Sequence, residues 1–218
     1  MKKALLKDSI KQIKKTNKRF ISILLMAFMG VGFFAGVRAT SPDMKITLDK
    51  YLDKYNVYDI NVVSTLGLTA DDINAISKVD GVEKAFGTYS EDVFVTIDDE
   101  EVVVKAYATI EEDINKLELI EGSMPENEDE CVIESIMKQG LNLGDYIEIR
   151  ENLSEDEESS FKTTKLKVVG IVKSPLYISR DRGTTTLGSG KVAYYMYINK
   201  NNIVSDIYTR NRYYCKRK

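Results

Sequence analysis

The chain has 218 residues, with 31 Lys and Arg against 34 Asp and Glu, and it contains no His and no Trp. The lack of His removes the usual proton shuttle and the commonest metal ligand, which excludes His-based catalysis and His-ligated metal sites. Two cysteines, Cys131 and Cys215, are too few for a disulfide framework. They could form one pair, but Cys131 lies in an apolar run and is expected to be a buried free residue.

The first predicted element is a basic amphipathic helix within residues 1–19, on the cytoplasmic side of a membrane. This segment carries eight Lys and Arg against the single acid Asp8. Leu6, Ile10 and Ile13 recur at spacings of four and three, which places them on one stripe of a helix. Nucleic acid is a rival partner for any lysine-rich segment. The apolar run that follows favours anionic membrane lipid instead, and no nucleic-acid partner is expected.

A transmembrane helix is predicted for residues 20–39. Residues 20–37 form an apolar run in which Ser22 is the only polar side chain. As a helix this run would extend about 27 Å, close to the hydrocarbon thickness of about 30 Å. Gly32 and Gly36, four residues apart, fit close helix packing in a membrane. The candidate membrane-spanning residues, one per turn, are Phe20, Leu24, Phe28, Gly32 and Gly36.

The position of basic residues predicts the orientation of this helix. Positive charge beside a first span stays in the cytoplasm, so residues 40–218 are expected to be extracytoplasmic, in a single-pass protein of the cell membrane. Residues 41–218 carry 22 Lys and Arg against 33 Asp and Glu, a net charge of −11. The alternative is a signal peptide cleaved after Ala39. The apolar run exceeds the usual 7–15 residues and follows nineteen others, which favours a retained anchor.

Beyond the span the pattern predicts an α+β domain of one or two subdomains, and not a doubly wound sheet. Thr69 is a predicted N-cap, and Gly81 marks the end of the same short helix. Apolar alternation and helical spacing predict the other elements. They are a helix over 43–55, a strand over 59–64, a hairpin of strands 93–97 and 102–108, a strand pair 146–150 and 165–172, and a last strand 192–198.

Residues 121–172 carry a series of glycine, proline and acidic positions in a recognisable order. The segment EGSMPENEDECVIE is followed by LNLGDYI and then by LKVVGIV. This series resembles the extracytoplasmic core domain of the MacB/FtsX-like permeases of ABC transporters. The resemblance extends over roughly residues 1–205, with the core domain at 40–205. The motif positions, each of which is also a plain turn or strand residue, are Gly122, Pro125, Glu130, Val132, Ile133, Gly144, Asp145, Ile147, Val169, Gly170 and Ile171.

The resemblance implies function by mechanical coupling. Permeases of this kind look like dimers whose outside domains move when separate cytoplasmic ABC ATPase subunits close on nucleotide. They export hydrophobic substrates or transmit a signal to an outside partner. For this chain the resemblance implies membrane lipid, an ATPase subunit and a homodimer as partners, with residues 2–18 as a surface brace near the ATPase.

The chain departs from this family after residue 198, where no further apolar run reaches spanning length. Residues 206–218 turn abruptly basic and show no periodicity. We therefore expect the N-terminal part of a permease, a fragment whose basic tail is out of context.

No catalytic, cofactor-binding or metal site is predicted, and the chain is not expected to be an enzyme. Residues 188–191 (GSGK) resemble part of a phosphate-binding loop. However, Thr185 stands where that loop requires its first Gly, and Val192 stands where it requires Ser or Thr after the Lys. Four acidic runs lack the order of an EF-hand, which favours solvated surface over calcium binding. Serine and cysteine nucleophiles have no His to activate them. The alternative function is a single-span anchored binding, sensor or adhesin protein with no transport role.

Overall fold

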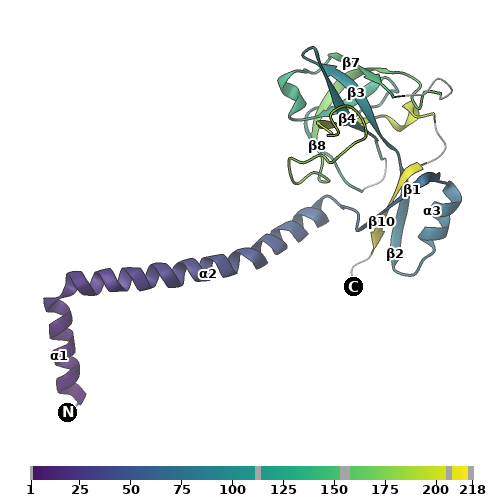
Figure 1. Cartoon of the computed structure of the whole chain (residues 1–218). Helices are drawn as coiled ribbons and strands as arrows, with labels where there is room; N and C mark the ends of the chain where they lie inside the picture. The colour runs from purple at the N-terminus through teal and green to yellow at the C-terminus, as the bar shows by residue number, and fades with distance from the viewer. Residues whose placement is uncertain (1, 111–113, 153–157, 205–207, 216–218) are drawn as a thin grey trace. The chain divides into compact units, whose positions relative to one another are not determined.

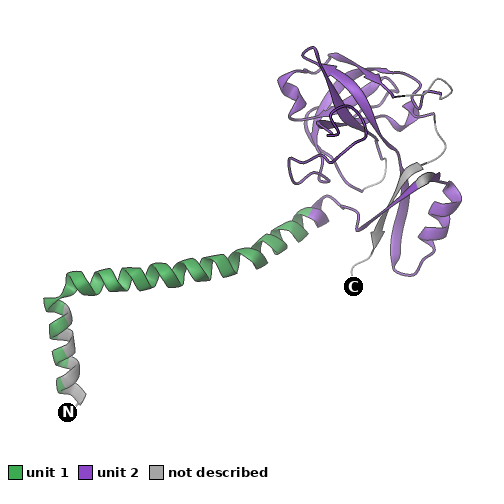
Figure 2. Ribbon diagram, in the orientation of Figure 1, with its two compact units in different colours: residues 1–51 green, residues 52–218 purple. Residues whose placement is uncertain are grey.

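The computed structural model describes residues 2–110, 114–152, 158–204 and 208–215. The chain divides into two compact units, Met1–Tyr51 and Leu52–Lys218 (Figure 2). We call them the helical unit and the sheet unit, and each is described by itself. The α+β fold class predicted from the sequence is confirmed by these elements.

The helical unit contains α1 (Lys2–Lys15) and most of α2 (Asn17–Lys54) (Figure 1). Lys14 and Lys15 occupy the last turn of α1, where the helix dipole favours positive charge. The apolar stripe predicted for α1 falls on Leu6, Ile10 and Ile13, which lie outside the described side chains.

Helix α2 is a single helix of 38 residues, about 57 Å long. It includes the apolar run and continues through most of the helix predicted over residues 43–55. Pro42 lies inside α2 and cannot donate a backbone hydrogen bond. By its length and composition α2 could cross a membrane, and none of its side chains is buried within the chain.

The sheet unit is built from two sheets. The three-stranded sheet has the order β1-β10-β2, and the seven-stranded sheet has the order β5-β8-β6-β9-β4-β3-β7. The strands are β1 (Ile60–Leu68), β2 (Val82–Thr88), β3 (Ser90–Ile97), β4 (Glu100–Ala108), β5 (Glu118–Gly122), β6 (Glu130–Glu134), β7 (Tyr146–Arg150), β8 (Lys165–Lys173), β9 (Tyr194–Ile198) and β10 (Tyr208–Cys215). The short helices are α3 (Ala70–Ser77), η1 (Met137–Gln139) and η2 (Lys200–Asn202).

The larger sheet closes on itself because β7 pairs with β3 on one side and with β8 on the other. Alternate residues of its strands therefore face either the enclosed core or the outer surface. On β9, Met196 and Ile198 belong to the main core cluster, while Tyr195 and Tyr197 belong to a second cluster on the opposite face. Cys131 is fully buried in the main cluster, as its apolar run predicted.

Two local predictions appear in the structure with their expected geometry. Thr69 caps α3 through a capping box with Asp72, which satisfies two backbone N–H groups that the helix leaves free. The predicted hairpin is β3 and β4, and its turn is shorter than expected because β4 begins at Glu100. Asp98 and Asp99 both have positive φ, 51° and 64°, as a two-residue hairpin turn requires.

The strand pattern beyond these elements differs from the prediction. The last predicted strand, residues 192–198, corresponds to β9, but β10 follows it at Tyr208–Cys215, within the segment expected to lack regular structure. Strand β10 pairs with β1 and with β2. Its partners lie more than a hundred residues earlier, so the pairing has no local signature. Strands β2, β5 and β6 were likewise not predicted.

Candidate functional site

The motif glycines of the sequence meet across one strand pair. Gly122 on β5 lies opposite Gly170 on β8 in the antiparallel register. Gly122 has a φ of +81°, and a Cβ atom there would collide with the carbonyl oxygen of Val169. A Cβ atom on Gly170 would collide in turn with the carbonyl oxygen of Ser123. The two backbones approach so closely that only glycine fits at either position.

The motif carboxylates close turns beside the same strands. The Glu130 carboxylate accepts hydrogen bonds from the backbone N–H of Glu126 at 2.8 Å and of Asn127 at 3.0 Å. Hydrogen bonds from the Asn127 side chain and backbone hold the pKa of Glu130 below its ordinary value. Asp145 accepts from the N–H of Asn142 at 2.8 Å. These groups are engaged with their own backbone, as turn-forming residues are.

Pro125 and Gly144 complete the motif positions. Pro125 is buried, and its carbonyl oxygen accepts from Asn199 Nδ2 at 3.3 Å. Gly144 has a φ of +92°, and its N–H donates to the carbonyl oxygen of Val168 at 2.8 Å. The structure thus gathers the motif residues around β8 and its neighbours.

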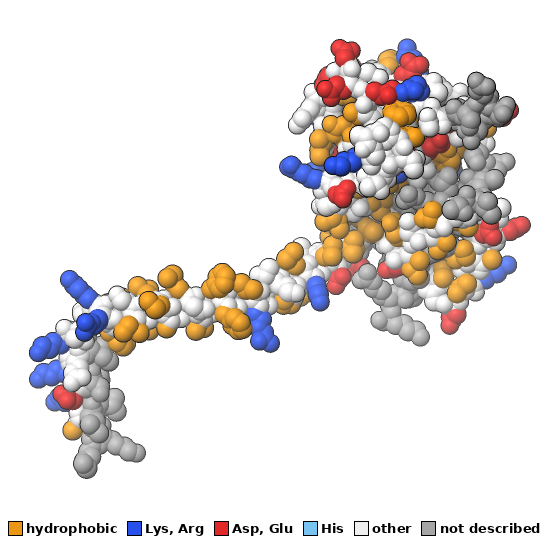
Figure 3. All heavy atoms as spheres, in the orientation of Figure 1, with side chains coloured by type: hydrophobic (Ala, Val, Ile, Leu, Met, Phe, Trp, Pro, Cys, Tyr) orange, Lys and Arg blue, Asp and Glu red, His pale blue; other side chains and the backbone are white. Residues whose placement is uncertain are grey.

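The candidate membrane-spanning residues lie on the exposed surface of α2. Phe20, Leu24 and Phe28 are 43%, 55% and 71% exposed. A Cβ atom added to Gly32 or Gly36 would meet nothing within 4 Å. Hydrophobic side chains cover this part of α2 in Figure 3. A continuous apolar surface of this kind is stable only against lipid or other helices.

The segment that directly follows α2 forms backbone hydrogen bonds within the sheet unit. The N–H of Asn115 donates to the carbonyl oxygen of Asn56 at 2.9 Å, and the N–H of Lys116 donates to that of Tyr55 at 2.9 Å. Asn115 Oδ1 also accepts from the N–H of Tyr58 at 3.2 Å. Tyr55 is buried. We call these five residues, which directly follow α2 or bind that segment, the joint.

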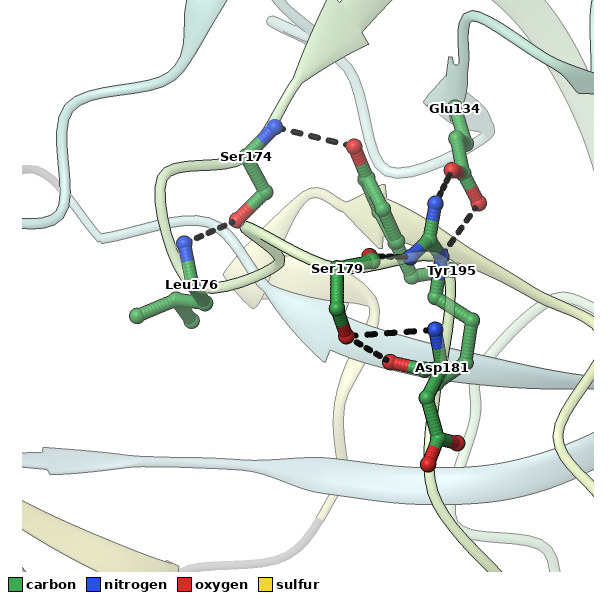
Figure 4. A network of polar contacts seen from close by, with 7 residues as sticks. Glu134, Ser174, Leu176, Ser179, Asp181 and Tyr195 are labelled. Carbon is green, nitrogen blue, oxygen red and sulfur yellow. Dashed lines mark hydrogen bonds and ion pairs between the residues drawn. The ribbon is translucent and has the colours of Figure 1, made fainter. Parts of the chain in front are cut away.

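A buried ion pair anchors the loop after β8 to β6. The Arg182 guanidinium forms hydrogen bonds with both carboxylate oxygens of Glu134, and the two side chains are 7% and 2% exposed. Arg182 also donates to the carbonyl oxygen of Ser179 (Figure 4). Burial opposes the charge of Arg182, but the hydrogen bonds and charge of Glu134 outweigh it and raise the pKa of Arg182. The guanidinium lies over the rings of Tyr177 and Tyr195 at 5.1 and 5.4 Å.

Tyrosine side chains continue this network over the outer face of β4 and β9. Tyr177 and Tyr195 stack at 4.6 Å between ring centroids, and Tyr107 stacks on Tyr197 at 5.2 Å. The hydroxyl of Tyr195 accepts from the N–H of Ser174 at 2.9 Å (Figure 4). The named polar groups of this network all have hydrogen-bond partners within the protein, as is typical of a network that stabilises the fold.

Three observations concern the other reactive groups in the part of the chain that the structure describes. No three His, Cys, Asp or Glu residues gather there at a spacing that could hold a metal ion. Burial raises the pKa of the Cys131 thiol, which keeps it in its unreactive form. The GSGK segment forms a closed loop in which the N–H of Thr185 donates to the carbonyl oxygen of Gly190 at 3.2 Å.

Sequence patterns did not reveal the joint or the buried ion pair. Asn115 and Asn56 are far apart in the chain, as are Arg182 and Glu134. A buried arginine in a loop has no periodic signature. The alternation of tyrosines at 195 and 197 is the one signal that could have indicated an aromatic cluster on one strand face.

No protein-family model and no curated protein matches the chain. Among solved structures the chain is similar to the extracellular domain of the ABC-type transporter YknZ from Gram-positive bacteria, with 16% identity and a TM-score of 0.45 over 71% of this chain and 76% of that one. It is also similar to the periplasmic region of MacB from Actinobacillus actinomycetemcomitans, with 14% identity and a TM-score of 0.43 over 71% of this chain and 66% of that one.

Proposed function

We propose that the chain belongs to a permease subunit of an FtsX/MacB-like ABC transporter. Helix α2 anchors it in the cell membrane, with residues 1–19 in the cytoplasm and residues 40–218 outside. The sheet unit passes motion from a separate cytoplasmic ATPase subunit to an outside partner or to a substrate for export. The chain itself catalyses no reaction, and a second copy completes the permease as a homodimer.

The observation that carries this proposal is that the apolar run belongs to one long helix, α2, and that the segment after α2 is hydrogen-bonded within the sheet unit. Helix α2 continues from the run to Lys54 without interruption. Directly after α2, the carbonyl oxygens of Tyr55 and Asn56 accept backbone hydrogen bonds from Lys116 and Asn115. We propose that motion of α2 in the membrane reaches the sheet unit through this segment.

The charge distribution supports the orientation and the partners. Lys and Arg are concentrated in residues 1–19 and at Arg38, whereas the later residues are acidic overall. Positive charge is retained on the cytoplasmic side of a span and attracts anionic lipid. The basic segment is then the part of the chain that lies within reach of a cytoplasmic ATPase.

A photo-crosslinking experiment on the full chain in native membranes tests the proposal. A photoreactive amino acid replaces Lys11 in one variant and the exposed hairpin residue Asp99 in the matched control. We expect the first variant alone to capture an ABC ATPase, identified by mass spectrometry, with both variants resisting alkaline carbonate extraction. A chain that resists extraction but captures no ATPase would favour the anchored binding or sensor alternative. Extraction into the soluble fraction would refute the anchor itself.

A further inference from the structure

A pocket of about 270 Å³ lies between the outer face of β4 and the loop that follows β8. The lining residues that matter here are Lys105 and Tyr107 on β4, with Leu176, Tyr177, Arg182 and Thr184 in the loop. An engineered apolar cavity of about 150 Å³ holds a benzene molecule. By that comparison this pocket has room for a molecule of one ring with a small side group.

The charged residues that line this pocket are both cations. They are Lys105 and Arg182, and no Asp or Glu of the described chain is among the lining residues. Their carboxylate partners lie elsewhere, since Asp92 lines a different pocket and the Glu134 side chain is only 2% exposed. Residues 41–218 as a whole are acidic, with 22 Lys and Arg against 33 Asp and Glu. A pocket lined by cations within an acidic unit favours an anionic ligand.

Both cations have hydrogen-bond donors beyond those that their partners use. A guanidinium has five N–H groups and an ammonium has three. Three N–H groups of Arg182 donate to Glu134 and to the carbonyl oxygen of Ser179 (Figure 4). One N–H group of Lys105 donates to Asp92. Within the described part of the chain, these bonds leave two N–H groups on each cation for a further acceptor.

Contacts within the protein hold the wall of this pocket in place. The Tyr107 and Tyr177 hydroxyls form a hydrogen bond of 2.7 Å, which joins β4 to the loop after β8. Thr184 forms an antiparallel bridge with Lys191 farther along the same loop. Arg182 is fixed by its ion pair with Glu134 on β6. A wall that is already ordered loses little freedom when a ligand binds.

We propose that this pocket binds a small carboxylate with a flat apolar body. The carboxylate would accept from Lys105 and Arg182, because charge-assisted hydrogen bonds offset the loss of its hydration. The flat body would contact Tyr107, Leu176 and Tyr177. Tyrosine rings also attract cations, but Arg182 already lies 5.1 Å from the Tyr177 ring centre, and both cations would repel a third. The inference goes beyond the proposed function and does not depend on an ATPase.

Benzoate, benzamide and benzamidine are suitable probes, because they share one shape and are anionic, neutral and cationic at pH 7. Binding to the full chain in nanodiscs of zwitterionic lipid is measured by ligand-observed NMR, with empty nanodiscs as the partition control. We expect saturable binding of benzoate, about tenfold weaker binding of benzamide and still weaker binding of benzamidine. Benzamide or benzamidine binding as tightly as benzoate would overturn the anion site. Benzoate binding no greater than in empty nanodiscs would overturn the proposal.

Two variants locate the site on the protein. Lys105→Met removes one cation, and Thr184→Glu adds a carboxylate at an exposed position of the pocket wall. Each is expected to weaken benzoate binding about tenfold. Because Thr184 is exposed, its variant tests the site without leaving a carboxylate unpaired, as the loss of Lys105 does.

Each variant has a matched control away from the pocket. Thr96→Glu makes the same change at an exposed strand position, and Lys138→Met removes a lysine that is paired with Glu121 on the surface. Both controls should bind benzoate as the unaltered chain does. Unchanged benzoate affinity in both pocket variants, or an equal loss in the controls, would refute the assignment.

Discussion

The close approach of β5 and β8 predicts that alanine at Gly122 is far more costly than alanine at an ordinary turn glycine. Gly122 has positive φ and lies opposite Gly170. An added methyl group at Gly122 would collide with the carbonyl oxygen of Val169 and come within 2.9 Å of the Gly170 Cα atom. Both neighbours are backbone atoms of a strand that is paired on both sides. They cannot turn aside as a flexible side chain would.

The expected magnitude has two parts. A non-glycine residue in the left-handed region costs about 1–2 kcal/mol. Forcing an extra methyl group into a close-packed site adds about 1–3 kcal/mol. Gly122→Ala should therefore lower the free energy of unfolding by about 2–5 kcal/mol. Gly144 isolates the first part, because it also has positive φ, +92°, yet a Cβ atom there would meet nothing within 4 Å. Gly144→Ala should cost about 1–2 kcal/mol.

The comparison can be made by urea unfolding of the full chain in detergent micelles at one fixed detergent concentration. Near-ultraviolet circular dichroism reports on the sheet unit, because the chain has no Trp and all of its 13 Tyr except Tyr51 belong to that unit. Any effect of alanine on the unfolded chain is common to both variants and cancels in their difference. Equal losses of stability for Gly122→Ala and Gly144→Ala would refute the inferred backbone contact.

Three further predictions concern buried or half-buried ionisable groups. Glu134→Gln should lower the free energy of unfolding in urea by about 3–5 kcal/mol, because it leaves Arg182 buried without a counter-charge. The double variant Glu134→Gln with Arg182→Met should lower it much less, because it removes the buried charge as well. Burial raises the pKa of Glu91 from its ordinary 4.5, so its ionisation makes stability fall as the pH rises through the raised value. Glu91→Gln should therefore be more stable than the unaltered chain at pH 7, and its free energy of unfolding should no longer show this fall with pH. The same dependence of unfolding free energy on pH in both chains would contradict this. In a Cys215→Ser background, Cys131 should react with iodoacetamide only after unfolding, and prompt labelling of the folded chain would contradict its burial.

Local patterns in the sequence were sufficient for several elements. The apolar run of residues 20–37 predicted a spanning helix, and the spacing after it predicted helix over 43–55; the structure joins the two in α2. Thr69 predicted the start of α3 as its N-cap, because the N-cap and the partner that the structure shows, Asp72, lie within four successive residues. The acidic turn at Asp98 and Asp99 lies between two β-branched runs, which predicted the hairpin. Each of these signals acts over a few residues and so is visible in the sequence itself.

The motif glycines illustrate what the sequence could show only in part. Turn chemistry accounts for Gly122 and a strand irregularity for Gly170 when each is considered alone. Their approach across β5 and β8 depends on the register of two strands that begin 47 residues apart. The fold therefore supplies the reason why glycine is required at both positions, although the motif already indicated that the positions matter.

The sequence by itself determined the apolar helix, the asymmetry of charge along the chain, the α+β class and the places of the tight turns. Only the tertiary structure decided that β7 closes the larger sheet, that β10 enters between β1 and β2, and that Arg182 meets Glu134. It alone brought Asn115 and Lys116 to the segment that follows α2. Hydrophobic periodicity and capping depend on neighbours within a turn or two of chain. Strand register, closure and cavities depend on segments that meet only when the whole core packs.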